Sequence, residues 1–131
     1  FQPLTSNDVC QIYEYLLELK LVSFPLTKEG RNKVESLVSN ITGSYFGKEI
    51  YKTTEEKALA YLYFIIKDHP FTDGNKRTAS LAFDVVCFIN KLKLDFDRYR
   101  LDALAIFIEK IDETDHQKVI RTLVEIVFSK A

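Results

Sequence analysis

The sequence predicts a mainly α-helical bundle with one short β-hairpin. Apolar residues recur at spacings of three and four along most of the 131-residue chain, which is the period of helices that bury one face. The stretch from Thr42 to Lys52 breaks this pattern with two glycines among aromatic and β-branched residues, which is typical of a hairpin. An apolar content of 47% and a charged content of 28% indicate one globular domain, which we expect to span residues 1–131.

Two helices are expected before the hairpin. The first follows candidate N-caps at Ser6 and Asn7 and ends before Pro25. The second runs from about Thr27 to Ile41 and carries an apolar stripe along one side. The hairpin therefore follows the second helix directly.

A helix that is apolar on nearly all sides is expected at the centre of the bundle. It covers residues 54–68, and its run from Ala58 to Ile66 contains no charged residue, which is typical of a buried helix. Thr53 and Glu56 have the spacing of a capping box at its start. Pro70 ends the helix, because the residue before a proline disfavours the α region.

Three further helices complete the predicted bundle. The first runs from about Asn75 to Asn90, and the other two occupy the tail on either side of a capping box that begins at Thr114. The apolar face of the first is assigned to Leu81, Val85, Phe88 and Leu92. Two apolar helices therefore meet at one short polar loop.

Charge and hydropathy exclude several classes of protein. The net charge of −1, with basic and acidic residues interspersed, argues against direct nucleic-acid binding. The uncharged run 58–66 is far shorter than the roughly 20 residues that cross a bilayer, so no membrane association is expected. Cys10 and Cys87 are expected to be buried free thiols, which suits a cytoplasm, the protein's own or that of a host cell. Because the chain begins at Phe1 and contains no Met, we expect it to be part of a longer protein.

The candidate chemistry lies in the segment His69–Arg77, with the sequence HPFTDGNKR. Gly74 permits a tight turn into the next helix, whose first backbone amides point at whatever lies in front of them. Lys76 and Arg77 add two positive charges at this helix start, where the helix dipole also favours an anion. This combination predicts a phosphate site.

Two further side chains of the loop fit phosphate chemistry. Asp73 offers a carboxylate, which is the kind of ligand that holds Mg²⁺ beside bound phosphates. His69 has an unperturbed pKa of roughly 6.5, so it can accept a proton near neutral pH. A base, a metal ligand and an anion cradle thus occur close together in the sequence.

Each of these side chains also has a structural interpretation. His69 alone fits a helix end, and Asp73 before Gly74 fits a turn. A metallohydrolase that uses His69 and Asp73 as ligands would leave the Gly-Asn-Lys-Arg run unexplained. We favour the phosphate site, because a turn needs neither a base nor paired cations.

The other histidine, His116, is expected to be exposed and to have no metal partner.

The loop HPFTDGNKR resembles the signature of the Fic/Doc family, H-P-F-x-D/E-G-N-x-R. The apolar helices on both sides of the loop and the aromatic hairpin upstream also resemble that fold, so the likeness covers the chain from the hairpin onwards. It implies a Fic-like helical bundle in which the hairpin is a flap. It also implies an enzyme that uses Mg²⁺ and ATP to modify a Ser, Thr or Tyr hydroxyl of a target protein.

The resemblance implies a role for each residue of the loop. His69 is expected to be the general base that deprotonates the target hydroxyl, Asp73 to bind Mg²⁺, and Phe71 to anchor the loop. The phosphates of the nucleotide are expected to be bound by the backbone amides of Gly74, Asn75 and Lys76 and by the side chain of Arg77. The Asn75 side chain is expected either to brace the loop or to touch a phosphate. A flap that aligns the target by strand pairing is expected at Tyr45, Phe46, Gly47, Lys48 and Glu49.

Position 76 bears on which group is transferred. Family members that transfer AMP mostly have glycine there, whereas the Doc (death-on-curing) branch has lysine, as here. Doc resembles a Fic protein that binds ATP in reverse and transfers its γ-phosphate to elongation factor Tu. Lys76 therefore favours phosphate transfer, with AMP transfer as the alternative because Gly74 stands where Doc-like loops often have alanine. An inactive Fic-like interaction module is a third interpretation.

Control of the activity is expected to come from outside these residues. Some Fic proteins carry an inhibitory helix with the pattern Ser/Thr-x-x-x-Glu-Gly/Asn. Residues 1–131 contain no such match. We therefore expect an antitoxin-like chain or an upstream segment to act as the inhibitor.

Overall fold

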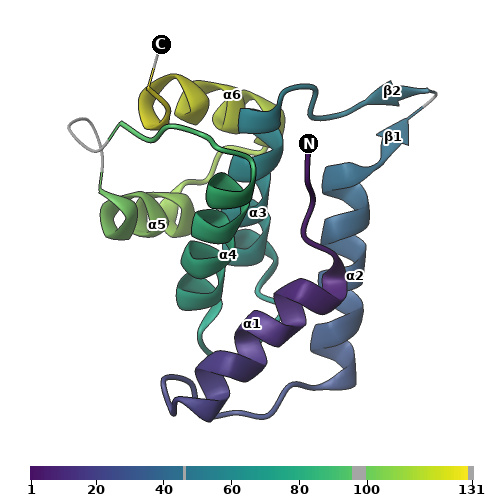
Figure 1. Cartoon of the computed structure of the whole chain (residues 1–131), viewed down its shortest axis with the longest axis vertical. Helices are drawn as coiled ribbons and strands as arrows, with labels where there is room; N and C mark the ends of the chain where they lie inside the picture. Colours follow the sequence, from purple (N-terminus) through teal and green to yellow (C-terminus); the bar gives the residue numbers. More distant parts are fainter. Residues whose placement is uncertain (46, 96–99, 130–131) are drawn as a thin grey trace.

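The computed structural model describes residues 1–45, 47–95 and 100–129. In this part of the chain, helices form a bundle from which one small hairpin projects (Figure 1). The elements are α1 (Ser6–Glu18), α2 (Lys28–Thr42), β1 (Ser44–Tyr45), β2 (Lys48–Glu49), α3 (Thr54–Asp68), α4 (Asn75–Ile89), α5 (Leu101–Lys110) and α6 (His116–Val127). The prediction of a mainly α fold with a hairpin before the central helix is confirmed. None of the described helices is long and apolar enough to cross a membrane.

α3 is the central helix, and it packs against α2, α4, α5 and α6. Its side chains from Ala58 to Ile66 are buried, except that of Phe64, which is partly exposed. A helix with apolar side chains on all sides is stabilised most when neighbouring helices cover it all round. The prediction of a buried central helix is therefore confirmed.

The ends of α3 have a defined local geometry. The helix begins after the N-cap Thr53, whose hydroxyl accepts a hydrogen bond from the Glu56 N–H at 3.0 Å. The second bond of the predicted capping box differs, because the Glu56 carboxylate accepts from the Thr53 hydroxyl, at 3.1 Å, and not from its backbone. The helix ends at Asp68, and His69 follows in a left-handed conformation with a φ of 46°. The loop that carries the candidate chemistry therefore starts with a sharp change of direction.

Two N-caps lie one residue or more from their predicted places. The N-cap of α1 is Thr5, not Ser6 or Asn7, and its hydroxyl accepts from the backbone N–H three residues on, at 3.1 Å. The N-cap of α6 is Asp115, not Thr114, and its carboxylate accepts from the N–H three residues on, also at 3.1 Å. In each case neighbouring side chains can cap equally well, so helical periodicity does not distinguish between them.

The buried face of α4 differs from the predicted one. Leu81 and Val85 are only partly buried, and Phe88 is 73% exposed. The buried face includes smaller side chains and is formed mainly by Ala79, Ala82, Phe83, Val86 and Cys87. The predicted and the observed buried residues both follow helical spacing, so spacing alone does not distinguish the two faces. The alanines allow α4 to approach α3 closely, which decides which face is buried.

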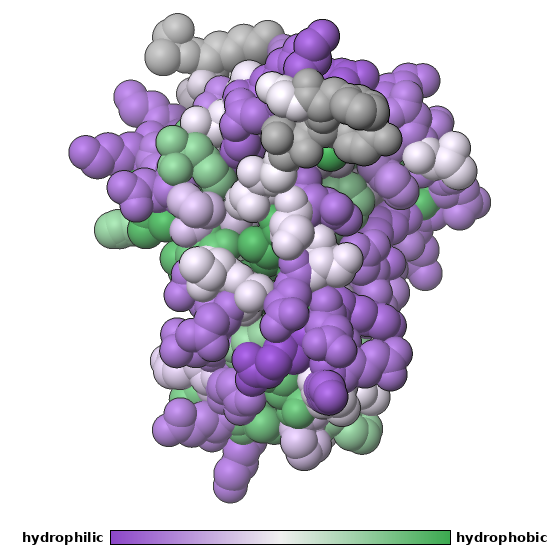
Figure 2. All heavy atoms as spheres, turned by 90° about the vertical axis from the view of Figure 1, so that its right-hand side faces the viewer, coloured by the Kyte–Doolittle hydropathy of each residue, from purple (hydrophilic) through white to green (hydrophobic). Residues whose placement is uncertain are grey.

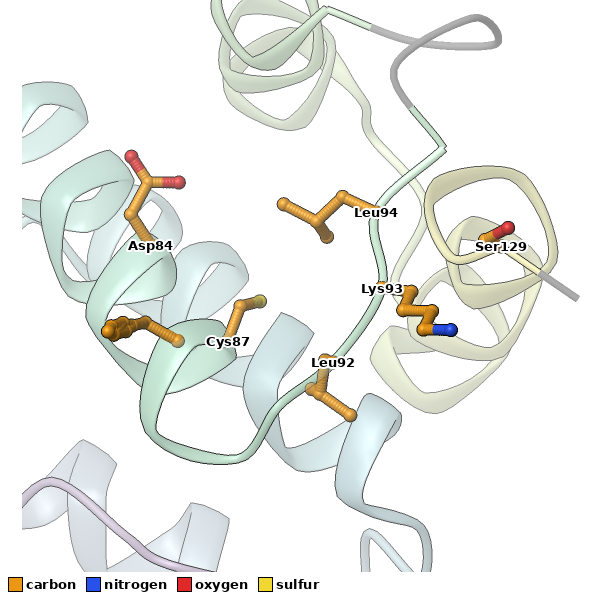
Figure 3. Close-up of a pocket in the computed structure, with 7 residues that line it drawn as sticks. Asp84, Cys87, Leu92, Lys93, Leu94 and Ser129 are labelled. Carbon is orange, nitrogen blue, oxygen red and sulfur yellow. The ribbon is translucent and has the colours of Figure 1, made fainter. Parts of the chain in front are cut away.

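The partly exposed side of α4 borders a hollow of about 490 Å³ near the end of the helix (Figure 3). Its side chains come from α4 and from the segments that follow α4 and α6. They are those of Asp84, Cys87, Phe88, Leu92, Lys93, Leu94 and Ser129. One carboxylate and one ammonium group among apolar side chains do not form a phosphate site.

The α2 side of the molecule is mainly hydrophilic. Figure 2, which views the side that faces right in Figure 1, shows only scattered apolar patches there. α2 buries its apolar stripe, which includes Val34, Leu37 and Ile41, and turns its charged residues outward. The described residues on this face form no large apolar patch (Figure 2).

Both cysteines are expected to be unreactive in the folded protein. Cys10 and Cys87 are free thiols with exposures of 1% and 3%. Burial raises the pKa of both thiols, and that of Cys87 to about 12, so at pH 8 both stay protonated and lack the reactive thiolate. We expect no reaction of the native protein with an aromatic disulfide reagent at pH 8, and reaction of both thiols in guanidinium. Fast reaction of Cys87 before unfolding would contradict this burial.

Candidate active site

The predicted loop residues surround one cavity of about 280 Å³. The loop between α3 and α4 lies at the end of these helices that is next to α1 (Figure 1). The cavity is lined by His69, Thr72, Asp73, Gly74, Asn75, Lys76, Arg77 and Glu109. All but Glu109 belong to the loop or to the first turn of α4. The structure therefore brings together His69, Asp73, Lys76 and Arg77, which the sequence singled out.

Gly74 is required at its position for two reasons. Its φ of 81° lies in the left-handed region, which residues with a side chain rarely adopt. A Cβ atom on Gly74 would also lie 2.2 Å from Cγ1 of Val22, which belongs to the segment between α1 and α2. This segment therefore packs directly against the start of α4.

Phe71 is held between the loop and α1. Its side chain is buried, and its ring stacks on that of Tyr13 with a centroid distance of 4.1 Å and an interplanar angle of 11°. Burial raises the pKa of the Tyr13 hydroxyl, and the Asp73 carboxylate raises it further. The loop thus rests on α1, with Asp73 close enough to act on the same tyrosine.

The N-terminus of α4 is open to a ligand. Side chains of the N-cap residues cap α1, α2, α3 and α6, whereas α4, after Gly74, and α5, after Arg100, have no such cap. The amide of Thr78 donates to the Gly74 carbonyl at 2.9 Å and so makes the first helical hydrogen bond. The three preceding amides, of Asn75, Lys76 and Arg77, have no partner in the helical ladder. They point along the positive end of the helix dipole, which makes this end an anion site.

Both cations of the loop are held at the rim of the cavity. Arg77 donates from Nη1 to the Leu21 carbonyl at 3.1 Å, and Lys76 forms an ion pair with Glu109 at 3.2 Å. Both residues are exposed, so a ligand can reach them. An arginine held at one end can still offer its remaining N–H groups to a phosphate.

Asn75 fixes the inside of the loop and does not face the ligand. Its side chain is buried, with Oδ1 accepting from Phe71 N–H at 3.0 Å and Nδ2 donating to the Phe71 carbonyl at 2.9 Å. Nδ2 also lies 3.2 Å from Nδ1 of His69. The Asn75 side-chain nitrogen can only donate a hydrogen bond. His69 Nδ1 can therefore accept this bond only in the tautomer in which Nδ1 carries no proton, and the bond then orients the imidazole. The side chain of Asn75 therefore braces the loop, and only its backbone amide is available to a phosphate.

Replacing Asn75 with leucine is expected to lower the free energy of unfolding by about 2–4 kcal/mol, measured in urea. The change leaves the N–H and carbonyl of Phe71 buried without partners, and each such group costs about 1–3 kcal/mol. Asn90 is a matched control, because its side chain holds the backbone of Gln2 in the same way but at an exposed position. Asn90→Leu is expected to cost about 1 kcal/mol or less, since water replaces the lost bonds. Equal losses for the two variants would contradict a clamp by Asn75.

Glu109 is a site residue that sequence reasoning missed. It lies on α5, and its side chain is 29% exposed. Its pairing with Lys76 depends on how α5 packs against α4, and neither periodicity nor spacing reports that contact. An acidic residue near the end of a helix is so common that no local signal singles it out.

None of the predicted flap residues that the structure describes lines the cavity. Tyr45 lies in β1, Lys48 and Glu49 lie in β2, and Phe46 lies outside the described residues. The hairpin joins the start of α3, whereas the loop follows its end, so the length of a 15-residue helix separates them (Figure 1). Glu49 is engaged elsewhere, in an ion pair with the buried Lys57 at 3.0 Å. Hairpins and loops that are neighbours in sequence need not meet, and here α3 keeps them apart.

The second histidine has a structural environment. His116 is exposed at the start of α6, and its Nδ1 lies 2.6 Å from the hydroxyl of Tyr63. Its ring also makes edge contacts with those of Tyr63 and Phe64. Among the described residues there is no group of three or more side chains that could hold a metal ion.

A second hollow, of about 530 Å³, adjoins the cavity and shares Lys76 and Arg77 with it. It lies between the end of α1, the outer side of α4 and α5. Apolar side chains line most of it, and they are those of Leu16, Leu21, Leu81, Ala105 and Ile106. Ser80, Asp84 and Asp102 add polar groups, and burial raises the pKa of the Asp84 carboxyl.

Comparison with known proteins identifies the family. A family model described as the Fic/DOC family matches residues 3–87, which include the whole loop, and the chain therefore belongs to that family. No curated protein and no solved structure matches the chain. The family in general comprises transferases that move part of a nucleotide onto proteins. The match ends within α4, so α5 with Glu109 and α6 lie beyond it.

Proposed function

We propose that this protein transfers a phosphate-containing group from ATP to a hydroxyl side chain of a target protein. The observation that carries this proposal is the uncapped N-terminus of α4, where three residues whose amides have no helical partner, two of them cationic, line one cavity together with His69. A polyanion is the ligand that such a site stabilises most. His69 lines the same cavity and can accept the proton that a target hydroxyl loses when it attacks the ligand.

Each residue of the loop has a distinct task in this reaction. His69 accepts the proton of the target hydroxyl as the hydroxyl oxygen attacks phosphorus. The bond from that phosphorus to the leaving group breaks, and the leaving group is ADP in phosphate transfer or pyrophosphate in AMP transfer. The α4 amides and Arg77 stabilise the charge that develops on the phosphate oxygens. Asp73 suits Mg²⁺, which proteins commonly hold with one or two carboxylates together with substrate phosphates. When bound there, Mg²⁺ supplies further positive charge to those oxygens.

The adjoining hollow offers room for the nucleoside. It begins at Lys76 and Arg77, which bind the phosphates in this proposal, and continues along α4 between Leu81 and Ile106. Apolar side chains suit the faces of a base, and the carboxylates of Asp84 and Asp102 can accept hydrogen bonds from sugar hydroxyls. A nucleotide would then lie along the outer side of α4.

The target protein is better placed at the segment between α1 and α2 than at the hairpin. This segment touches the loop through Val22, and its Leu21 carbonyl accepts from Arg77. On the same segment, Leu21 and Phe24 expose 47% and 48% of their surface. Exposed apolar side chains on a segment that contacts the loop are suited to hold a protein segment.

Phosphate transfer is the favoured reaction, and AMP transfer is the second candidate. Lys76 supports phosphate transfer through the resemblance to the Doc branch. Gly74 supports AMP transfer, because Doc-like loops often have alanine there, whereas the contact with Val22 excludes a side chain at this position.

Label transfer from ATP tests the proposal. The protein is incubated in a cytosolic extract with Mg²⁺ and ATP labelled either at the α- or at the γ-phosphate. Protein-bound label from the γ position alone indicates phosphate transfer, and label from the α position indicates AMP transfer. Parallel reactions with a His69→Asn variant subtract the kinases of the extract. No His69-dependent label from either position would contradict the proposal and favour an interaction module.

A further inference from the structure

Among the residues that the structure describes, Glu109 is the one carboxylate of the cavity that does not belong to the loop or to α4. It enters from α5, and its Oε1 lies 3.2 Å from Nζ of Lys76. Exposed ion pairs of this kind contribute only about 0–1 kcal/mol to stability, so stability gives little reason for Glu109. Its position on the cavity wall instead makes it part of the environment of any ligand.

Glu109 changes the charge that a ligand meets. Lys76 and Arg77 bring two positive charges to the cavity, and Asp73 and Glu109 bring two negative ones, so the charged side chains sum to zero. Without Glu109 the sum would be +1. A positive sum attracts a bare polyanion more strongly than a polyanion whose charge is partly neutralised by a bound cation, so a neutral sum weakens the advantage of the bare form.

Lys76 is also poorly placed without a partner. It occupies the second residue of α4, after the N-cap Gly74 and Asn75, where the helix dipole disfavours a cation. Glu109 compensates for this while no phosphate is present. A metal-free triphosphate must therefore compete with Glu109 for Lys76 and also approach its negative charge, whereas a metal-bound triphosphate brings a cation that both carboxylates attract.

We propose that Glu109 is a specificity-determining residue that makes the site prefer metal-bound over metal-free nucleotide. This inference rests on the proposed function, because it takes ATP as the ligand of the cavity. It places the discrimination on α5, outside the residues that the family match covers. Removing the charge is expected to improve binding of the metal-free form selectively.

The test compares Glu109→Gln with the unchanged protein by calorimetric titration at low ionic strength, because salt screens such interactions. Each protein is titrated with ATP in excess Mg²⁺ and with ATP in a chelator. Glu29→Gln is the matched control, since Glu29 forms an exposed ion pair with Lys33 on α2, away from the cavity. Melting temperatures check that both variants remain folded.

We expect Glu109→Gln to bind metal-free ATP about tenfold more tightly, a change that one unit charge near a phosphate typically causes, and Mg·ATP with an affinity within about threefold of the original. The preference for Mg·ATP should shrink accordingly, and Glu29→Gln should leave it unchanged. An unaltered preference in Glu109→Gln, with Mg·ATP still bound, would overturn this inference and leave the proposed function standing. No binding of either form to the unchanged protein would overturn both.

Discussion

Replacing His69 with asparagine is expected to reduce group transfer by a factor of about 10²–10⁴, the usual contribution of a general base, while nucleotide affinity stays within about twofold. Asparagine tolerates the left-handed conformation that His69 adopts, with its φ of 46°, and it cannot accept a proton near neutral pH. It therefore removes the base without a large change in the backbone. Alanine would also remove the base, but it would add strain at this φ.

Two measurements on the same samples distinguish a chemical role from a structural one. Transfer is followed by label incorporation, and nucleotide binding by titration with Mg·ATP. His116→Asn is the matched control, because His116 is exposed and contacts Tyr63 and Phe64 away from the cavity, and it should retain transfer. A parallel loss of binding and transfer in His69→Asn would show that the histidine maintains the loop and is not the base.

Replacing Gly74 with alanine is expected to lower the free energy of unfolding by about 2–5 kcal/mol. The left-handed conformation costs a residue with a side chain roughly 1–2 kcal/mol. The new Cβ would lie 2.2 Å from Cγ1 of Val22, and overpacking of this kind costs about 1–3 kcal/mol more. The loss is measured by urea denaturation with a common m-value.

Gly47 separates the two contributions. Its φ of 77° is close to that of Gly74, but no described residue beyond its two chain neighbours has an atom within 4 Å of the position of its Cβ. Gly47→Ala should therefore show the conformational cost alone, and the excess for Gly74→Ala should measure the contact with Val22. Combining Gly74→Ala with Val22→Ala should recover part of that excess, with a coupling of about 0.5–3 kcal/mol. Equal costs for the two glycine variants would contradict close packing of the segment between α1 and α2 on the loop.

The features that sequence predicted correctly are those that neighbouring residues determine. The all-round apolar run of α3 leaves no alternative to a central position, and Thr53 and Pro70 determine where that helix begins and ends. The loop HPFTDGNKR combines a turn, a helix start and its charges in one short segment, so its residues share one cavity almost irrespective of the rest of the fold.

The features that sequence could not predict depend on contacts between distant segments. The face of α4 that packs on α3 is decided by how closely small side chains such as Ala79 and Ala82 allow the helices to approach. The contacts of Val22 with Gly74 and of Glu109 with Lys76 join segments that are far apart in the chain. Their residue types are ordinary, so neither contact leaves a pattern in the sequence.

The hairpin illustrates the same limit. Its aromatic and glycine-rich composition indicates its local structure correctly, and its two-residue strands pair as expected. Its distance from the cavity follows from the direction of α3, which composition does not report. The segment between α1 and α2, which carries no comparable signal, occupies the place beside the loop.

The central claim is that the start of α4 binds the phosphates of a nucleotide. Nuclear magnetic resonance of the ¹⁵N-labelled protein, titrated with Mg·ATP, tests it most directly. We predict that the largest amide shifts occur at Gly74, Asn75, Lys76 and Arg77, with smaller shifts at α5 beside Glu109. Shifts that concentrate on the hollow at the far end of α4, or no shifts at millimolar nucleotide, would contradict the claim.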